Sequence, residues 1–163
     1  MPLEPAQATP PAGKALPLFA DTALLQPPTL CFNGVRVLLV EDNLVNQRVA
    51  QALLKKIGCR VDIAANGSEG VAMARKFPFA AILMDCQMPE MDGFEATKAI
   101  RRHENGSGKR IPIIAMTASA MESDRLHCLE VGMDDYISKP VKPHLLAEVL
   151  AKWVGTLPLT ALE

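Results

Sequence analysis

Short apolar runs alternate with segments of helical periodicity along most of this chain. The apolar runs, rich in β-branched residues, predict buried strands at 35–40, 60–64, 79–84, 111–116 and 136–137. Apolar residues that recur every three or four positions predict helices at 44–57, 66–76, 93–102, 119–131 and from Pro143 onward. Five strands alternating with five helices predict an α/β fold, in which helices cover both faces of a parallel sheet.

The helical periodicity also predicts which side chains face the core. In the first helix the predicted apolar face holds Val45, Val49, Leu53 and Ile57, and Gly58 ends the helix. The third helix should turn Phe94, Thr97 and Ile100 inward. The apolar face of the last helix should consist of Leu145, Leu146, Val149, Leu150 and Trp153.

Polar residues of different chemical types follow the predicted strands. Right-handed crossovers leave few sheet orders, and we expect the flavodoxin-like (βα)5 doubly wound order 2-1-3-4-5. In such sheets ligands bind beyond the carboxyl ends of the strands, where the order reverses. The side chains at those ends are Glu41, Asp42, Asp85, Thr117 and Lys139. One site centred on Asp85 is therefore expected at this edge.

The chemistry of these groups indicates phosphoryl transfer. Three carboxylates at one edge repel one another and would raise at least one pKa unless a cation compensates. A hard divalent cation such as Mg²⁺ suits oxygen ligands, and Lys139 adds a fixed positive charge. A carboxylate beside these charges can act as a nucleophile toward phosphorus, with Thr117 donating a hydrogen bond to a phosphoryl oxygen. The product would be an aspartyl phosphate at Asp85.

Five stretches, in order along the chain, resemble the receiver domains of response regulators. They are VLLVEDN at 37–43, ILMDCQMP at 82–89, MDG at 91–93, MTA at 116–118 and DYISKP at 135–140. Together they cover the span from about Val35 to Trp153. Small departures are Ala80, where such receivers often carry Asp, and Gly70, where they often carry Ala.

The resemblance implies a metal site around the phosphoacceptor Asp85. It implies that Asp42 and Asp85 coordinate Mg²⁺ (or Mn²⁺) directly, that the backbone carbonyl of Gln87 completes the protein ligands, and that Glu41 acts through metal-bound water. It also implies that Gln87 and Ser119 flank the path of the water that slowly removes the phosphoryl group.

The resemblance further implies a conformational switch. Lys139 should contact the phosphoryl group, and its bond to Pro140 should be cis. Thr117 and Tyr136 should form the switch pair: Thr117 moves toward the phosphoryl oxygen and Tyr136 turns inward. The face around the fourth and fifth helices is the expected readout.

Several motifs are most similar to receivers attached to hybrid sensor histidine kinases. These motifs lie at 41–47, 87–89, 96–97 and 132–136. The implied partner is a histidine kinase and/or a histidine phosphotransfer domain, with the latter docking near the first helix and the active-site loops. The expected location is cytoplasmic, including the cytoplasmic part of a membrane-bound sensor kinase.

Composition sets the expected boundaries. Residues 1–33 hold seven of the thirteen prolines and predict a largely flexible linker, followed by a receiver domain at 34–155 and a tail at 156–163 whose last residues are a cloning scar or a native end. The net charge of −1 indicates neither nucleic acid nor a membrane surface, and no apolar run approaches a membrane span. The start lacks a signal-peptide pattern, and four cysteines without zinc or CxxC spacing predict free thiols, with Cys86 as a small core residue.

Simpler structural roles compete with functional ones at several positions. Asp42, Asn43 or Thr117 could be helix caps, and Glu90 with Asp92 could form a turn and cap. The charges predicted to form a solvated face are Arg101, Arg102, Lys109 and Arg110, and Asp134 and Asp135 are expected near the fifth strand as loop acids. The histidines expected at the surface are His103, His127 and His144. The phosphoryl donor would then come from another domain or protein.

Three alternatives to a hybrid-kinase receiver stay open. One is a stand-alone single-domain response regulator. A second is a haloacid-dehalogenase-like phosphatase, which would need an Asp where Gln87 stands and a cap domain. A third is an interaction module without phosphate chemistry, whose mark would be a lost acid or lysine. By this reasoning the domain catalyses its own phosphorylation and slow dephosphorylation but is not a stand-alone enzyme.

Overall fold

Five parallel strands form the central sheet of this computed structural model, which describes residues 30–119, 121–155 and 157–158. The strands are β2 (Arg36–Val40), β3 (Arg60–Ala64), β4 (Ala81–Asp85), β5 (Ile113–Thr117) and β6 (Asp135–Ser138). They lie in the order β3-β2-β4-β5-β6 with every pair parallel. The predicted order 2-1-3-4-5 is confirmed.

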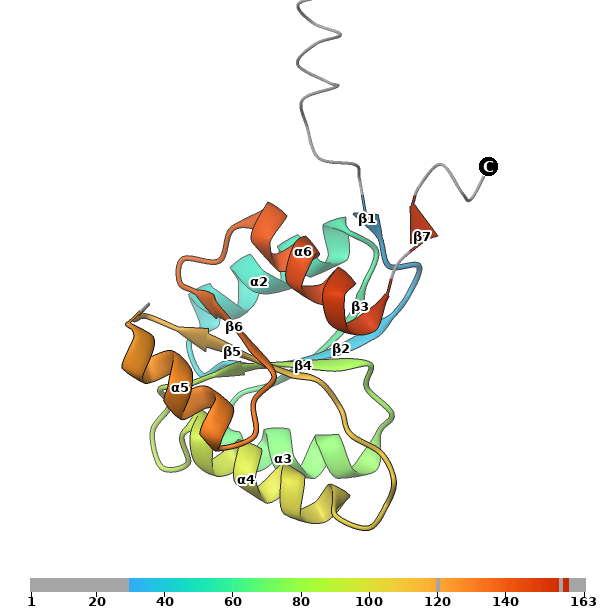
Figure 1. The fold of residues 1–163 in the computed structure, drawn as a ribbon. Coiled ribbons are helices and arrows are strands. Elements are labelled where there is room, and N and C mark those ends of the chain that lie inside the picture. Colours follow the sequence, from blue (N-terminus) through green and yellow to red (C-terminus); the bar gives the residue numbers. More distant parts are fainter. Residues whose placement is uncertain (1–29, 120, 156, 159–163) are drawn as a thin grey trace, which may run out of the picture.

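Helices cover both faces of the sheet (Figure 1). They are α2 (Leu44–Lys56), α3 (Gly67–Lys76), α4 (Gly93–Glu104), α5 (Glu122–Glu130) and α6 (Pro143–Val154). Alternate strand residues bury into two cores: Leu38 and Ile82 pack toward α3, α4 and α5, whereas Leu39 and Leu83 pack toward α2 and α6. Burial on both faces explains why the strands are continuous apolar runs.

The predicted inward face of α2 is wrong in part. Val45 is 68 % exposed and Val49 is 50 % exposed, and the side chains that α2 buries are Gln47, Ala50 and Leu54. The buried stripe includes Gln47 because its amide nitrogen donates a hydrogen bond to the carbonyl of Glu41, 2.7 Å away, at the end of β2. A polar contact therefore rotates the helix so that part of its apolar surface faces outward.

The other helix faces and caps follow the predictions more closely. The buried side chains are Thr97 and Ile100 in α4 and Leu146 and Leu150 in α6, while Phe94 is half-buried and Leu145 and Trp153 lie at the exposed margin. The N-caps are Asn43 in α2, Asn66 in α3 and Asp92 in α4. The fourth predicted helix begins later than expected, at Glu122, and its N-cap Met121 makes no side-chain cap bond.

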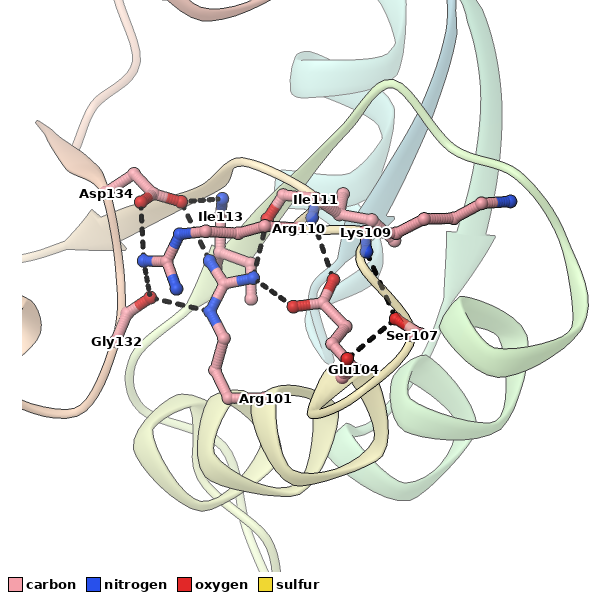
Figure 2. Close-up of polar contacts among 9 residues, drawn as sticks. All are labelled: Arg101, Glu104, Ser107, Lys109, Arg110, Ile111, Ile113, Gly132 and Asp134. Carbon is pink, nitrogen blue, oxygen red and sulfur yellow. Dashed lines mark hydrogen bonds and ion pairs between the residues drawn. The ribbon is translucent and has the colours of Figure 1, made fainter.

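Arg101, predicted to be solvated, is instead largely covered and lies beside Asp134 (Figure 2). Arg101, whose side chain is 13 % exposed, donates hydrogen bonds to the carbonyls of Gly132 (2.9 Å) and Ile111 (2.8 Å) and pairs with Asp134 (2.8 Å) and Glu104 (2.6 Å). The last turn of α4 lies against the loops before β5 and β6, so this guanidinium satisfies a backbone carbonyl from each loop. The remaining predicted surface positions are exposed: Arg102, Lys109, Arg110, His103, His127 and His144.

A short antiparallel pair lies beside the main sheet. β1 (Leu30–Cys31) pairs with β7 (Leu157–Pro158), and the following Phe32 is buried, with its N–H donating to the carbonyl of Ile57 at 2.9 Å. The last residues of the predicted linker thus pair with the first residues of the predicted tail. The rest of both segments lies outside the described residues, so their flexibility stays a prediction. Within the described part of the chain, no helix has the length and apolar character needed to cross a membrane.

Gly70 stands where similar receivers often carry Ala, and the packing of α3 on β2 explains why a side chain does not fit here. A Cβ atom at this position would lie 2.8 Å from Cγ2 of the fully buried Val40, because α3 packs closely on β2. We expect Gly70→Ala to lower the free energy of unfolding by about 2 kcal/mol, since overpacking forces the backbone to shift. Urea denaturation measures this cost.

The neighbouring exposed Ser68 provides the control. Ser68→Ala should change stability by less than about 0.5 kcal/mol. In a double-mutant cycle, Val40→Ala should recover about 1 kcal/mol of the Gly70→Ala cost, because it removes the clashing methyl groups. Strictly additive costs would show that the clash with Val40 is not the cause.

Candidate functional site

Three acidic side chains meet at the carboxyl ends of β2 and β4. Glu41 and Asp42 follow β2, and Asp85 is the last residue of the adjacent β4. One carboxylate oxygen from each lies within 4.8 Å of the others. Glu41 and Asp85 are 1 % and 2 % exposed, whereas Asp42 is exposed to solvent. The sheet topology brings the predicted acids together.

Local hydrogen bonds fix the orientation of two of these acids. The backbone N–H of Asn43 donates to Oε1 of Glu41 at 3.1 Å, and the N–H of Gln87 donates to Oδ1 of Asp85 at 3.2 Å. The start of α4 packs against the backbone of Asp85 so closely that any Cβ at Gly93 would collide with the Asp85 carbonyl. The cluster is therefore held by the ends of two strands and the start of one helix.

Lys139 supplies the positive charge of the site. Its Nζ lies 2.9 Å from Oδ1 of Asp85 and 3.1 Å from Oε2 of Glu41. Its backbone N–H donates to the carbonyl of Thr117 at 2.8 Å, and its bond to Pro140 is cis, as predicted. Burial alone would lower the pKa of Lys139, but the hydrogen bonds and charges of Asp85 and Glu41 outweigh it and raise that pKa. Lys139 therefore carries its charge at neutral pH.

The donor set fits a hard divalent cation. Three carboxylates face one ammonium, which leaves two negative charges uncompensated within the described residues of the cluster. Oxygen-only ligands are those that Mg²⁺ prefers, and the exposed Asp42 keeps one side open to water, which Mg²⁺ gives up reluctantly. The arrangement can hold Mg²⁺ next to a buried carboxylate.

Thr117 and Tyr136 lie on the adjacent strands β5 and β6. Thr117 ends β5, where its Oγ1 donates to the carbonyl of Ser119 and accepts from the Ser119 N–H, both at 3.1 Å. Thr117 does not cap a helix, because α5 begins only at Glu122. Tyr136 is half-buried in β6, and the guanidinium of Arg125 lies 4.6 Å from its ring centroid. No hydrogen bond between either side chain and Asp85 is present among the described residues.

Sequence reasoning missed Gln47 and Arg125 as supports of the site. Gln47 was not assigned a role from sequence, and only the backbone carbonyl of Glu41 that its side chain bonds reveals one. Arg125 gave no signal, since its contact with Tyr136 crosses from α5 to β6. The prediction for Cys86 is confirmed: the residue is buried, and burial raises the pKa of its thiol, which stays protonated.

Comparisons with known proteins agree with this geometry. The family model of the response regulator receiver domain matches residues 37–151. Histidine kinase 1 of Arabidopsis thaliana is 40 % identical over 150 residues, which cover 72 % of this chain and 12 % of the kinase. In this kinase and seven further curated relatives, the matched region spans 6 to 16 % of the relative's length.

Two solved structures have the same fold. The receiver domain of sensor histidine kinase PA1611 from Pseudomonas aeruginosa, solved with a magnesium ion in its active-site cleft, is 48 % identical with a TM-score of 0.68, covering 75 % of this chain and 98 % of that one. The receiver domain of the Saccharomyces cerevisiae response regulator Ssk1, solved with the histidine phosphotransfer protein Ypd1, belongs to a match at 35 % identity, with a TM-score of 0.70 and coverage of 76 % and 90 %. With the family match and this likeness over the whole βα sheet, the chain belongs to the response regulator receiver domain family.

Proposed function

We propose that this chain is the receiver domain of a hybrid sensor histidine kinase, in which Asp85 accepts a phosphoryl group from a phosphohistidine. The observation that carries the proposal is the buried Asp85 carboxylate, held 2.9 Å from the Lys139 ammonium and within reach of two further acids. The family match spans residues 37–151, inside the proposed receiver domain at 34–155. The proposed linker at 1–33, tail at 156–163 and cytoplasmic location belong to the same proposal.

The chemical step uses the carboxylate as the nucleophile. An oxygen of Asp85 forms a bond to phosphorus while the bond between phosphorus and the donor imidazole nitrogen breaks, and the imidazole leaves with that electron pair. When bound by Asp42, Asp85 and the Gln87 carbonyl, with Glu41 acting through water, Mg²⁺ (or Mn²⁺ in its place) would offset charge on the transferring group. Lys139 exchanges one carboxylate partner for a phosphoryl oxygen, so its charge stays paired throughout.

The proposed switch begins at Thr117. Its hydroxyl now bonds to Ser119, and turning toward a phosphoryl oxygen exchanges that neutral hydrogen bond for a charge-assisted one. The space that Thr117 leaves can be filled by Tyr136, whose ring then gives up its contact with Arg125. Phosphorylation would thus bias a two-state element on the β6 side of the sheet.

The proposed docking surface for a histidine phosphotransfer domain lies next to the site, on α2. The exposed apolar side chains of α2 would contact a partner that presents a phosphohistidine. Leu44, Val45 and Val49 are 68, 68 and 50 % exposed at the start of α2. Val49 also lines a cavity of about 130 Å³ together with Pro140, and this cavity reaches Glu41 and Lys139. Such a partner would bring its imidazole to Asp85 from this side.

The alternatives explain fewer of these observations. A stand-alone regulator would use the same site, but the curated matches are to histidine kinases and hybrid signalling proteins many times longer than this chain. For a haloacid-dehalogenase-like phosphatase, the position of the second acid is occupied by Gln87, whose side chain is exposed. An interaction module without phosphate chemistry would not need the paired Lys139 and acids.

The direct test of the domain's own chemistry uses a small donor. The protein is incubated with acetyl phosphate, with Mg²⁺ or with EDTA, and its intact mass is followed. We expect one phosphoryl adduct that forms only with Mg²⁺ and is removed by hydroxylamine, which cleaves acyl phosphates. Phosphorylation that is independent of the divalent cation, or that resists hydroxylamine, would contradict the proposal.

The partner surface gives a separate prediction. Val49→Asp should slow transfer from a phosphorylated histidine phosphotransfer domain by about tenfold, because it places a charge in an apolar contact. Labelling by acetyl phosphate should not change. The matched control is Leu129→Asp on α5, an equally exposed apolar residue (55 %) on another helix. If both variants transfer at the wild-type rate, the partner does not dock on α2.

A further inference from the structure

A second concave site lies at the pole of the sheet opposite Asp85. The cavity measures about 560 Å³ and is formed where α3 and α4 end and where the chain enters β4 and β5. Its walls are residues 74–80 on one side and residues 103–104, 107 and 109–112 on the other. It is separate from the acidic cluster, which lies at the carboxyl ends of the same strands.

The floor of this cavity is apolar. Phe79 is 6 % exposed, Phe77 and Ile111 are half-buried, and the two phenylalanine rings meet edge to face with centroids 6.2 Å apart. Pro78 and Pro112 add further apolar surface. A flat apolar group could therefore displace water here without losing hydrogen bonds.

The rim of the cavity is strongly positive, although the whole chain has a net charge of −1. Four permanent cations line it, Arg75, Lys76, Lys109 and Arg110, against the single carboxylate of Glu104. Both oxygens of Glu104 are engaged, one by Arg101 at 2.6 Å and the other by the backbone N–H of Ile111 at 2.8 Å.

Most of these cations have no carboxylate partner. Arg110 pairs with Asp134 at 2.8 Å, whereas Arg75, Lys76 and Lys109 make no ion pair with any described residue. Arg75 and Lys76 also complement the dipole of α3, in whose last turn they lie. Lys109 belongs to a loop, so no helix end explains its charge.

The wall that carries Lys109 is fixed by its own hydrogen bonds (Figure 2). Arg101 holds the carbonyl of Ile111 at 2.8 Å, and Oγ of Ser107 donates to the Glu104 carbonyl at 2.6 Å and accepts from the Lys109 N–H at 3.2 Å. In Figure 2 the Lys109 side chain extends away from this network, and its ammonium has no partner among the residues drawn. The wall is thus organised before any ligand arrives, which lowers the entropic cost of binding.

We propose that this cavity binds a small organic anion that joins a flat apolar ring to a phosphate or carboxylate group. The ring packs on the floor around Phe77 and Phe79, and the anion is held by Lys109 and Arg75. The volume lies within the range of about 300–1,000 Å³ that is usual for small-molecule sites. The inference goes beyond the proposed phosphorelay function, since it uses none of the residues around Asp85.

Titration of the ¹⁵N-labelled protein, followed by amide chemical shifts, tests this proposal. The probes are adenosine 5′-monophosphate and indole-3-acetate, which carry the two anionic groups. The half-ligands are adenosine and inorganic phosphate for the first probe, and indole and acetate for the second. At least one aromatic anion should saturate with a dissociation constant below about 1 mM, shifting residues 74–80 and 103–112, and its half-ligands should bind about tenfold more weakly. The anion that saturates identifies the ligand's charged group. If neither probe saturates these residues, or if the shifts fall elsewhere, the proposal is wrong.

Charge reversals distinguish a specific site from general attraction. Lys109→Glu and Arg75→Glu should each weaken the saturating probe by about tenfold, because each removes a charge-assisted hydrogen bond. The matched control is Lys55→Glu, an exposed lysine in the last turn of α2 on the other face of the sheet, which should leave binding unchanged. Equal effects of all three variants would show non-specific attraction and overturn the proposal. Labelling of Asp85 by acetyl phosphate should be the same in all three.

Discussion

Replacing Asp85 by Asn should abolish phosphorylation and at the same time stabilise the metal-free protein. The amide cannot attack phosphorus, so labelling by acetyl phosphate should fall about a thousandfold or more, to background. Asn can still accept the hydrogen bond from the Gln87 N–H through its carbonyl oxygen, so the loop should keep its structure. Intact mass measures the first effect.

The stability effect follows from the charges of the cluster. Three carboxylates share one ammonium, so removing one negative charge relieves repulsion between the two buried acids Glu41 and Asp85. We expect the free energy of unfolding in EDTA to rise by about 1 kcal/mol, and stabilisation by Mg²⁺ to be largely lost. The control is Asp92→Asn, which should keep wild-type labelling because Asn caps a helix as well as Asp does. Labelling of Asp85→Asn at the wild-type rate would mean that another residue is the acceptor.

Replacing Lys139 by Met should slow phosphorylation and destabilise the metal-free protein. The ammonium is the only cation that pairs with Asp85 and Glu41 among the described residues, and Met keeps the length of the side chain without its charge. Loss of this positive charge should reduce the initial rate with acetyl phosphate by about a hundredfold. It should also lower the free energy of unfolding by about 2 kcal/mol, since two buried carboxylates lose their partner.

Divalent metal and pH separate this effect from a general loss of packing. Mg²⁺ should restore more stability to Lys139→Met than to the wild-type protein, because it replaces the missing charge. The pKa of Lys139 is raised in the folded state, so its contribution should be complete below the unfolded pKa of 10.5 and lost as the pH rises through the higher folded pKa. If Mg²⁺ stabilises both proteins equally, the lysine does not balance the charge of the cluster.

The main features of this fold and site follow from sequence for a simple physical reason. Parallel strands buried on both faces must be apolar, and their carboxyl ends must converge, so the residues that follow them are brought together without knowledge of any contact. This places Asp42, Asp85 and Lys139 in one site even though 43 or more residues separate neighbouring members. Asn43 and Asp92 could also be identified as caps, because capping depends on residues three positions apart.

Other features depend on tertiary contacts that no local pattern encodes. Val45 and Val49 are apolar yet exposed, because Gln47 turns α2 by bonding to Glu41. Arg101 is charged yet largely covered, because two loops present carbonyls to it from other parts of the chain. The pairing of β1 with β7 joins segments of two residues each, more than a hundred residues apart, which are too short to show an alternating pattern.

The measurement that tests the central claim most directly is phosphoryl transfer from a histidine phosphotransfer domain. The donor domain, labelled with ³²P on its histidine, is mixed with this chain in Mg²⁺, in EDTA, and with the Asp85→Asn variant. The account predicts that label leaves the donor and appears as a hydroxylamine-sensitive adduct on the wild-type chain only when Mg²⁺ is present. Two results would contradict the account. One is label that reaches the Asp85→Asn variant at the wild-type rate. The other is label that stays on every phosphohistidine donor tested although acetyl phosphate labels the chain.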